Sequence, residues 1–241
     1  MKIRRYLMLV AACTFFLGKS IAANNEKPFV IPELQEWRGA QGMFTPSATS
    51  RIVWLGKDSA VARVANQFAE DYETMFGRKL AVVQGRASAG DFVFSLSGDR
   101  QLGEEGYAVR IADRVSISAP KAKGLYWATR TILQMTEQNS DQALPKGAVR
   151  DYPDYAIRGF MMDCGRKFIP MDFLRDYVKM MAYYKMNTFQ VHLNDNAFKQ
   201  YYEHDWNKTY SAFRLECETY PGLTARDGYY TKKEFIALQE L

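Results

Sequence analysis

The chain has 241 residues, of which 47% are apolar and 14% aromatic, a composition that indicates one or two globular domains and argues against disorder. The formal net charge is +5, but four basic side chains lie in the first 22 residues, namely Lys2, Arg4, Arg5 and Lys19. Removal of this segment on export would leave a net charge of about +1 and no long basic run. We therefore expect no nucleic-acid partner.

The first 22 residues show the three regions of a secretory signal peptide. A basic start is followed by an apolar core from Tyr6 to Leu17 and by Ser20-Ile21-Ala22, a small-x-small cleavage site. A membrane anchor is the alternative, and it is disfavoured because an apolar run of about 12 residues is shorter than the roughly 20 that span a bilayer.

A second alternative at the N-terminus is lipoprotein processing at Cys13. It ranks lower because the apolar run continues beyond the cysteine. In each case the sequence predicts an exported protein, periplasmic or at the cell surface, with no membrane span once the signal is removed.

Two cysteines remain after the signal, Cys164 and Cys217. One disulfide is compatible with an oxidising compartment, and two buried free thiols are the favoured alternative. The two histidines, His192 and His204, do not combine with cysteines or carboxylates at a metal-ligand spacing. A glycine-rich phosphate loop and a nucleophile elbow are also missing from the sequence. We expect neither a metal nor an organic cofactor.

Residues 24–150 are predicted to form an α+β domain, with helices packed on one face of a mixed sheet. Its entry segment, 24–50, is rich in proline and is expected to hold one edge strand. The other expected strands are Arg51–Gly56, Leu80–Val83, Phe92–Leu96 and a hairpin of Gly106–Ile111 with Arg114–Ser118.

Two helices are expected in the same domain. The first covers Val61–Phe76 and ends at Gly77, which occupies the C′ position. The second runs from about Lys121 to Gln138, and residues 140–147 after it are predicted to be a surface loop. The buried face of the second helix is expected to consist of Leu125, Thr129, Ile132, Leu133 and Thr136.

A β-α-β unit is predicted between Ala156 and Asn196. Two apolar runs, Ile157–Met162 and Thr188–Leu193, flank a pattern with helical period, which is long enough for a parallel crossover. Ligands meet such units at the carboxyl ends of the strands, and Arg166 and Asp195 lie just past those ends. The apolar face of the helix is expected to consist of Phe173, Leu174, Tyr177, Met180, Met181 and Tyr184.

Residues 197–226 show no clean period and are rich in aromatic and polar side chains. An irregular stretch of this length in a compact domain favours a functional loop. Its aromatic rings are predicted to form a wall for sugars, and an equally weighted alternative is that they only pin the loop to the surface. These residues are Tyr201, Tyr202, Trp206 and Tyr210.

A new helix is predicted to begin after Thr231, with Glu234 in the capping-box position. The sequence reaches Leu241 without a helix stop signal. Because a (β/α)₈ barrel takes about 250 residues, residues 151–241 are expected to be the first two βα units of an incomplete TIM barrel, truncated in this chain.

Two stretches of the predicted barrel resemble a known family. Arg158–Pro170 reads Arg-Gly-Phe-Met-Met-Asp-Cys-Gly-Arg-Lys-Phe-Ile-Pro, and Lys185–Asn196 reads Lys-Met-Asn-Thr-Phe-Gln-Val-His-Leu-Asn-Asp-Asn. They resemble the first and second barrel strands of family 20 glycoside hydrolases, the β-N-acetylhexosaminidases. Further similarity to this family is carried by Glu105–Tyr107, Gly124–Gln134, Tyr220–Thr224 and Gly228–Glu234.

The resemblance implies a retaining exo-glycosidase that acts on glycans ending in β-linked GlcNAc or GalNAc. The 2-acetamido group of the substrate is then the nucleophile, an exception among glycosidases. The family's catalytic Asp-Glu pair lies on the fourth barrel strand and is expected to be absent from this chain. The resemblance therefore implies an enzyme whose truncated form, represented by this chain, is inactive.

Two residues match substrate-site positions of the family. Arg166 matches the arginine that grips hydroxyls of the terminal sugar, a role that suits the rigid fork of guanidinium donors. We favour this role over an ion pair with Asp163 or Asp195. Asp195 matches a carboxylate that supports the catalytic glutamate through a later histidine, and a turn cap is weighed equally. His192 is expected to be a buried core histidine.

Arg158 is expected to brace the base of the first barrel strand, and Asp163 to hold Arg166 or loop amides. Three positions depart from the family pattern. Val191 replaces the tryptophan of the second strand, Asn196 replaces the second aspartate, and Lys167 replaces the histidine after the substrate arginine. These departures bear on substrate choice and loop geometry and leave the fold prediction unchanged.

Two other functions remain open at this stage. The chain is alternatively a non-catalytic glycan-binding protein of the cell envelope, motivated by the aromatic loop and the polar strand ends. A third hypothesis is a barrel hydrolase of another class with a different nucleophile, which fold analogy alone does not exclude.

Overall fold

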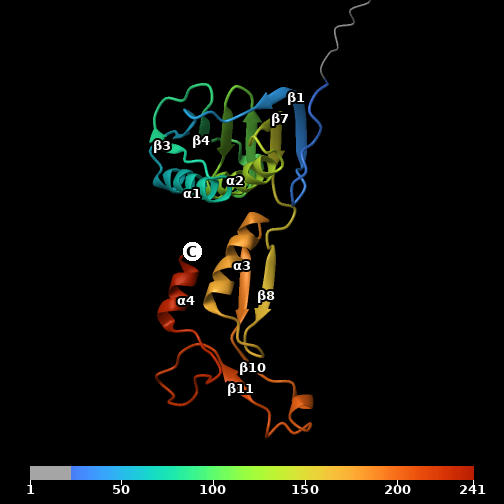
Figure 1. The fold of residues 1–241 in the computed structure, drawn as a ribbon, viewed down its shortest axis with the longest axis vertical. Helices are drawn as coiled ribbons and strands as arrows, with labels where there is room; N and C mark the ends of the chain where they lie inside the picture. Colours follow the sequence, from blue (N-terminus) through green and yellow to red (C-terminus); the bar gives the residue numbers. More distant parts are fainter. Residues whose placement is uncertain (1–22) are drawn as a thin grey trace, which may run out of the picture.

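The computed structural model describes residues 23–241, so the predicted signal peptide lies outside the described residues. It contains a sheet domain followed by two βα units (Figure 1). Helices α1 and α2 of the sheet domain lie between its sheet and the βα units. None of the helices in the described part of the chain has the length and apolarity needed to cross a bilayer.

The sheet domain is built on one mixed seven-stranded sheet, ordered β1-β7-β5-β6-β4-β2-β3. Strands β2, β3, β4 and β6 pair in parallel, and the remaining pairs are antiparallel. The predicted edge strand and hairpin are both present. The strands are β1 Glu36–Phe44, β2 Arg51–Trp54, β3 Ala81–Gln84, β4 Phe92–Leu96, β5 Tyr107–Ile111, β6 Val115–Ala119 and β7 Leu144–Asp151.

Two long helices cover one face of this sheet, as expected. Helix α1 spans Ser59–Phe76; Asp58 caps its start, and Gly77 ends it in the left-handed conformation. Helix α2 spans Ala122–Glu137 and buries all five side chains of its predicted face. A short 3₁₀ helix, η1, spans Arg100–Leu102. The core between sheet and helices includes Phe68, Tyr72, Phe92, Phe94, Ile117, Leu125 and Ile132, all fully buried.

The prediction of a surface loop over 140–147 is wrong in its second half, because β7 begins at Leu144. Proline and glycine in this segment suggested a turn, yet the strand pairs with β1 on one side and β5 on the other. Gly147 is needed in the strand because a Cβ there would lie 2.4 Å from the ring of Trp37. Gly147 is typical of turns, but here it lies inside the sheet because Trp37 of the neighbouring strand packs against it.

The second region starts with the predicted β-α-β unit. Strand β8, Gly159–Asp163, and strand β9, Thr188–His192, pair in parallel with Asp163 opposite His192. Helix α3, Met171–Tyr183, connects them. The polar residues that follow the two strands therefore emerge at the same edge of the sheet.

Only part of the predicted apolar face of α3 is buried. Leu174 and Met181 lie in the core, whereas Phe173 and Met180 are 52% and 46% exposed. Tyr177 contacts the rings of Phe160 and Phe189 on the two strands. The helix thus packs on the strand pair along one stripe, and the rest of its apolar side faces solvent.

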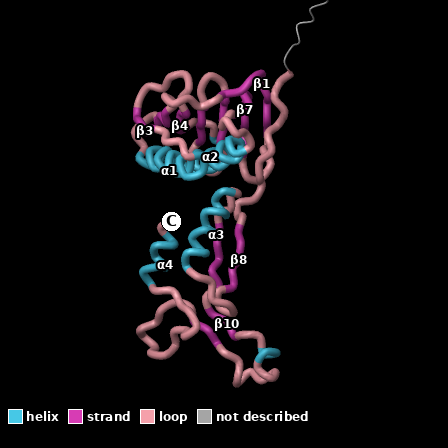
Figure 2. The backbone as a smooth tube through the Cα atoms, in the orientation of Figure 1, coloured by secondary structure: helices cyan, strands magenta, loops and turns pink. Residues whose placement is uncertain are grey.

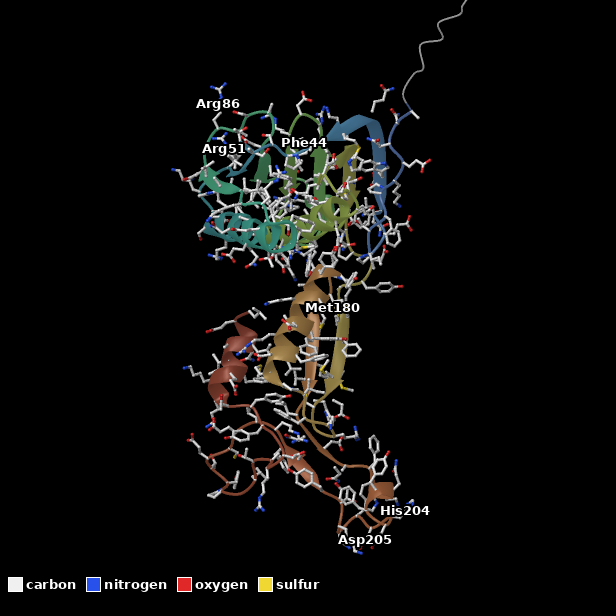
Figure 3. All side chains as sticks on the ribbon, in the orientation of Figure 1. Phe44, Arg51, Arg86, Met180, His204 and Asp205 are labelled. Atoms are coloured by element: carbon white, nitrogen blue, oxygen red, sulfur yellow. The ribbon has the colours of Figure 1, made fainter. Side chains whose placement is uncertain are left out.

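A long loop region follows β9 (Figure 2). It contains a short antiparallel pair, β10 Asn194–Asn196 with β11 Ser211–Phe213, and a 3₁₀ helix, η2 Lys199–Tyr201. Its tip, with His204 and Asp205, lies at the end of the molecule opposite the sheet domain (Figure 3). Helix α4, Lys232–Gln239, begins with the predicted capping box of Thr231 and Glu234.

Candidate functional site

The side chains that follow β8 and β9 form one connected polar cluster. The guanidinium of Arg166 donates to Asp163 Oδ2 at 2.6 Å and lies 2.7 Å from Asp195 Oδ2. The backbone N–H of Arg166 also donates to Asp163 Oδ1 at 2.9 Å. The structure therefore brings Arg166 and Asp195 together, and Asp163 holds Arg166 as expected. The Arg166 side chain remains 35% exposed, so it is accessible from solvent.

His192 is not the buried core histidine that the sequence suggested. Its side chain is 36% exposed, and Nε2 lies 2.9 Å from Asp195 Oδ2. The residue ends β9, where alternation turns the side chain toward the polar cluster rather than the core. Its carbonyl accepts the backbone N–H groups of Cys164 and Gly165, which fixes the loop that carries Arg166.

Gly165 allows this loop to lie against β10. A Cβ at this position would be 2.8 Å from the backbone nitrogen of Asp195, closer than side chains tolerate. Glycine therefore brings the loop of Arg166 within ion-pair distance of Asp195. The short distance between Arg166 and Asp195 thus depends on position 165 having no side chain.

The cluster keeps its charges at neutral pH. Burial acts to raise the pKa of Asp163, but hydrogen bonds from Arg166 outweigh it and hold that pKa below its ordinary value. The pKa of Asp195 is lowered chiefly by its hydrogen bond with His192, then by the Asn196 amide and the charge of Arg166. Asp163 in turn raises the pKa of Arg166. Two carboxylates and one guanidinium thus face solvent in fixed geometry.

Aromatic side chains of the following loop extend the cluster. The ring of Phe198 lies 5.2 Å from the guanidinium carbon of Arg166. Tyr201 is 77% exposed and Trp206 is 59% exposed, and the ammonium of Lys199 lies 5.2 Å from the centre of the Trp206 ring. Tyr210 does not belong to such a wall, because its hydroxyl donates to Asp227 and pins the loop. Of the four residues of the predicted aromatic wall, Tyr201 and Trp206 are therefore exposed, Tyr202 is half-buried, and Tyr210 has a structural role.

Arg214 is the most important residue that sequence reasoning missed. It is 1% exposed, and its guanidinium donates to the carbonyls of Cys164, Gly165 and Gly228. It also makes two hydrogen bonds to Asp227, whose pKa is lowered mainly by this contact. Arg214 therefore joins the loop of Arg166 to the segment before α4. An arginine between the apolar residues Phe213 and Leu215 was the available signal.

Arg158 has the structural role that was expected. It donates to Glu105 at 2.5 Å and to the carbonyls of Tyr155 and Lys185, at the amino end of β8. Asn187 reinforces the same contact by donating to Glu105. These bonds tie the barrel strands to the sheet domain, far from the polar cluster.

Both cysteines are free thiols, but only Cys164 is buried, so the expectation of two buried thiols is half wrong. Burial raises the pKa of the Cys164 thiol, which makes it a poor nucleophile. Among residues 23–241, His, Cys, Asp and Glu form no group of three or more that could hold a metal ion. The chemistry available at this edge is hydrogen bonding and charge–charge contact.

Comparison with known families matches both regions. Residues 27–152 match the model described as glycosyl hydrolase family 20, domain 2. Residues 155–239 match the model described as glycosyl hydrolase family 20, catalytic domain.

Solved structures show the same fold. A mutant Streptomyces plicatus β-hexosaminidase in complex with its product GlcNAc superposes with a TM-score of 0.74 at 23% identity, covering 90% of this chain and 44% of that one. The β-N-acetylhexosaminidase of Streptomyces coelicolor gives a TM-score of 0.73 at 22% identity, with the same coverage of both chains. This chain therefore has the fold of the first part of these TIM-barrel enzymes.

Curated relatives are similar over a smaller part of their length. The β-hexosaminidase of Akkermansia muciniphila is 34% identical over 118 residues, which cover 48% of this chain and 24% of that protein. The β-hexosaminidase of Porphyromonas gingivalis is 27% identical over 171 residues, 67% of this chain and 20% of that protein. The chain thus spans about a quarter or less of these relatives. With one family model matching more than half of its residues, the chain belongs to glycosyl hydrolase family 20.

Proposed function

We propose that the chain supplies the sugar-binding edge of an exported β-N-acetylhexosaminidase, which removes terminal β-linked GlcNAc or GalNAc from glycans. The observation that supports this most is the fixed, solvent-accessible guanidinium of Arg166 at the carboxyl end of β8. Relatives named β-hexosaminidase support the same class of substrate, and one solved relative holds GlcNAc as product.

Arg166 has hydrogen-bond donors left for a sugar. A guanidinium carries five N–H donors, and the ion pairs with Asp163 and Asp195 engage one terminal nitrogen each. The remaining donors are free to bind two neighbouring hydroxyls of a terminal sugar in a forked arrangement. Because the two carboxylates hold the guanidinium before the substrate arrives, little side-chain entropy is lost on binding.

In this proposal the bond-breaking groups are not among the described residues. The family's Asp-Glu pair lies on the fourth barrel strand, whereas residues 23–241 contain the two barrel strands β8 and β9. The substrate's acetamido group would attack the anomeric carbon, with the Asp orienting it and the Glu acting as acid and then base. Asp195, bonded to His192, would support that Glu from outside the reacting centre.

Kinetics on two proteins test this activity. The 241-residue chain should not hydrolyse a chromogenic β-GlcNAc glycoside above blank, whereas a longer product with the further βα units should. In the longer product, Arg166→Lys should lower kcat/KM about a hundredfold, since two charge-assisted hydrogen bonds are lost. Arg175→Lys, at a half-buried position of α3 where the arginine pairs with Asp172, is the matched control and should leave kcat/KM unchanged.

Three results would contradict the proposal. Turnover by the 241-residue chain would show that the bond-breaking groups lie within it. If the longer product does not turn over the glycoside, the proposed hydrolase activity is wrong. An unchanged kcat/KM in Arg166→Lys would return Arg166 to the role of a structural ion-pair partner.

We also propose export through a signal peptide that ends at Ala22. Mass spectrometry of the protein recovered from the periplasm or cell surface should find Ala23 at the amino terminus. A lipid-modified Cys13 at the amino terminus would instead support lipoprotein processing, and an intact Met1 would contradict export.

A non-catalytic glycan-binding protein is the second candidate, favoured by the exposure of Tyr201 and Trp206. The two functions differ in their dependence on Arg166. If the aromatic loop alone binds glycans, GlcNAc oligomers should bind the 241-residue chain equally well before and after Arg166→Lys. Loss of binding in Trp206→Ala would identify the loop as the binding element.

A further inference from the structure

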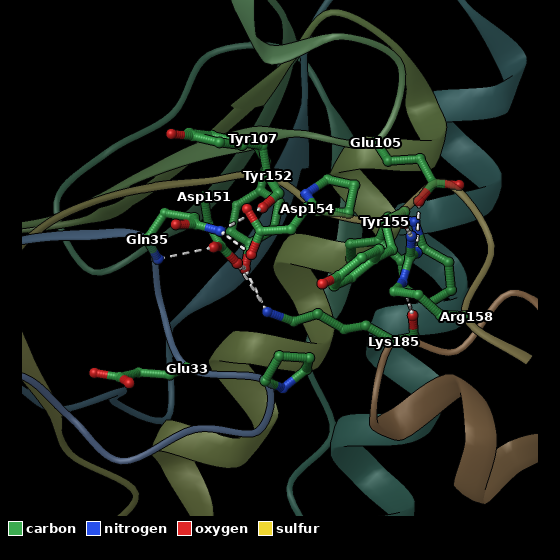
Figure 4. Close-up of a pocket in the computed structure, with 13 residues that line it drawn as sticks. Glu33, Gln35, Glu105, Tyr107, Asp151, Tyr152, Asp154, Tyr155, Arg158 and Lys185 are labelled. Atoms are coloured by element: carbon green, nitrogen blue, oxygen red, sulfur yellow. Dashed lines mark hydrogen bonds and ion pairs between the residues drawn. The ribbon is translucent and has the colours of Figure 1, made fainter.

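We propose that a cavity between the sheet domain and the barrel strands binds one residue of a neutral pyranose sugar. The cavity has a volume of about 230 Å³, and both regions of the chain contribute to its lining (Figure 4). Pockets for drug-sized ligands measure roughly 300–1,000 Å³. A smaller cavity suits a ligand of about one sugar ring.

The cavity and the Arg166 cluster lie at opposite ends of the barrel strands. Arg158 and Lys185, which line the cavity, precede β8 and β9, whereas Arg166 and Asp195 follow the two strands. A parallel strand rises about 3.3 Å per residue, so a five-residue strand separates its ends by roughly 16 Å. A sugar in the cavity would therefore not occupy the Arg166 site, and it would bind whether or not the chain takes part in hydrolysis.

The walls of the cavity are mainly flat rings. Trp127 is 6% exposed and lies deep, whereas Tyr155 is 75% exposed and lies at the rim. Tyr152, Pro32 and Pro153 complete the apolar lining. The aromatic rings among them can pack against the C–H faces of a pyranose, because those hydrogens carry a slight positive charge and an aromatic ring face a slight negative one. The two prolines contribute apolar surface only.

Lys185 provides a hydrogen-bond donor at the cavity. Its ammonium donates to the hydroxyl of Tyr107 at 2.7 Å and to Asp151 Oδ2 at 3.0 Å, and the side chain is 8% exposed (Figure 4). An ammonium carries three N–H donors, and these two hydrogen bonds account for two of them. The indole N–H of Trp127, which lines the same cavity, is buried without a hydrogen-bond partner among residues 23–241. A buried donor without a partner is costly, and a sugar hydroxyl would accept from it.

The backbone holds this donor in place. Lys185 follows α3 with a φ of 59°, a conformation that favours glycine. The hydrogen bonds of the ammonium with Tyr107 and Asp151 compensate for the strain of this positive φ. The donor therefore does not need to reorganise when a ligand arrives.

The charges around the cavity disfavour an anionic ligand. Five of the six charged residues that line it belong to three ion pairs within the protein, and the sixth, Asp154, makes no ion pair among residues 23–241, so an anion would meet an unneutralised carboxylate. A neutral ligand would leave the three pairs undisturbed. These pairs are Lys185 with Asp151, Arg158 with Glu105, and Glu33 with Lys27 from outside the lining.

Asp154 provides the complementary acceptor. It lines the cavity and accepts a hydrogen bond from Gln35 Nε2 at 2.9 Å, which leaves carboxylate lone pairs for a hydroxyl donor. A ligand that fills the cavity should therefore have apolar ring faces, an acceptor for Lys185 and a donor for Asp154. A pyranose has all three, whereas a purely apolar molecule would leave both polar groups unpaired.

Tryptophan indole N–H resonances provide a direct test. The chain has four tryptophans, and a ¹H–¹⁵N spectrum of the full chain should resolve four indole signals, with that of Trp127 assigned through Trp127→Phe. Titration with N-acetylglucosamine, glucose and galactose should shift the Trp127 signal saturably. We expect at least one sugar to bind with a Kd on the order of 1–10 mM, typical of one small ligand with few contacts.

Substitutions locate the sugar. Tyr155→Ala removes an exposed ring at the rim and should weaken binding about fivefold without unfolding the chain. Tyr220→Ala is the matched control, because Tyr220 is 66% exposed and does not line the cavity. Arg166→Ala should leave the Trp127 shift unchanged, which separates this cavity from the proposed hydrolase site.

Three outcomes would overturn the proposal. No saturable shift of the Trp127 signal with any of the sugars would exclude a pyranose. A saturable shift that is equal in Tyr155→Ala and wild type would place the sugar elsewhere. A shift confined to Trp206 would assign sugar binding to the aromatic loop instead.

Discussion

In the sheet domain, α1 and α2 cover the sheet and the strands bury apolar side chains, three in succession in β4 and every second residue in β6. In the barrel units, the buried cluster of the described residues holds five members, and Phe160 and Met161 of β8 are 45% and 49% exposed. Both regions use strands and amphipathic helices. They differ in the number of neighbours that each strand has. Most strands of the seven-stranded sheet lie between two others, whereas β8 and β9 have only each other.

The two regions are therefore held together by different forces. Apolar burial stabilises the sheet domain, whereas the barrel units depend more on polar ties such as Arg214 and the Arg166 cluster. Substitutions and pH should therefore affect them differently. In the solved relatives the same fold continues beyond the part that this chain covers.

The largest expected effect breaks the apolar core. Phe68 is fully buried among Tyr72, Phe92 and Phe94, so Phe68→Ala should lower the free energy of unfolding by about 4 kcal/mol. Phe160→Ala, in the barrel units, should cost under about 1.5 kcal/mol because the ring is already half exposed. Urea unfolding of both variants measures the difference. Equal losses would show that the two regions are packed alike.

Removing the buried guanidinium tests the polar ties. Arg214→Met leaves the carbonyls of Cys164, Gly165 and Gly228 without their donor, and should cost about 3 kcal/mol. Hydrogen exchange should show faster exchange in residues 164–230 and little change in the sheet domain. Arg226→Met, an exposed neighbour, is the control. Uniform acceleration over the whole chain would contradict a local role.

A smaller effect is expected at the start of α4. Thr231 accepts from the backbone N–H of Glu234, and Glu234 accepts from that of Thr231. Thr231→Ala removes one half of this capping box and should cost about 1 kcal/mol. The loss should appear as reduced protection of α4 in hydrogen exchange, with α1 unchanged as the internal reference. No change in α4 would mean that the cap does not limit its stability.

The smallest effect is a dependence on acid. The pKa of Asp227 is lowered first by its hydrogen bond with Arg214, so its contribution to stability is present above the ordinary carboxyl pKa and is lost as pH falls through the lowered value. Asp227 is 54% exposed, which limits the contribution to below about 1 kcal/mol. Urea midpoints at pH 6 and pH 3 should differ less in Asp227→Asn than in wild type. An identical pH dependence would exclude the contribution.

Local signals in the sequence predicted most elements of both regions. The period of apolar residues located α1 and α2, Gly77 marked the end of α1, and the Thr231 capping box marked the start of α4. These features depend on residues within a few positions of one another. The β7 strand was missed because its proline and glycine are typical of turns, and their place in the sheet depends on Trp37, more than 100 positions away.

The candidate site was predicted in part for the same reason. The two apolar runs of the β-α-β unit placed Arg166 and Asp195 past neighbouring strand ends, and the structure brings them to 2.7 Å. The role of His192 was predicted wrongly, since a residue at a strand end belongs to the core or to the edge according to its neighbours. Arg214 was missed because its partners lie in two separate segments.

The sequence by itself determined most of the segments that become helices and strands, and that the polar residues of two parallel strands would share one edge. Local propensity, capping and periodicity are enough for these, because each acts over less than about 20 residues. The tertiary structure decided which side chains are buried, how Arg214 fixes the loop of Arg166, and where the Lys185 cavity lies between the two regions. Those features arise from contacts between distant segments, and only the folded chain brings such segments together.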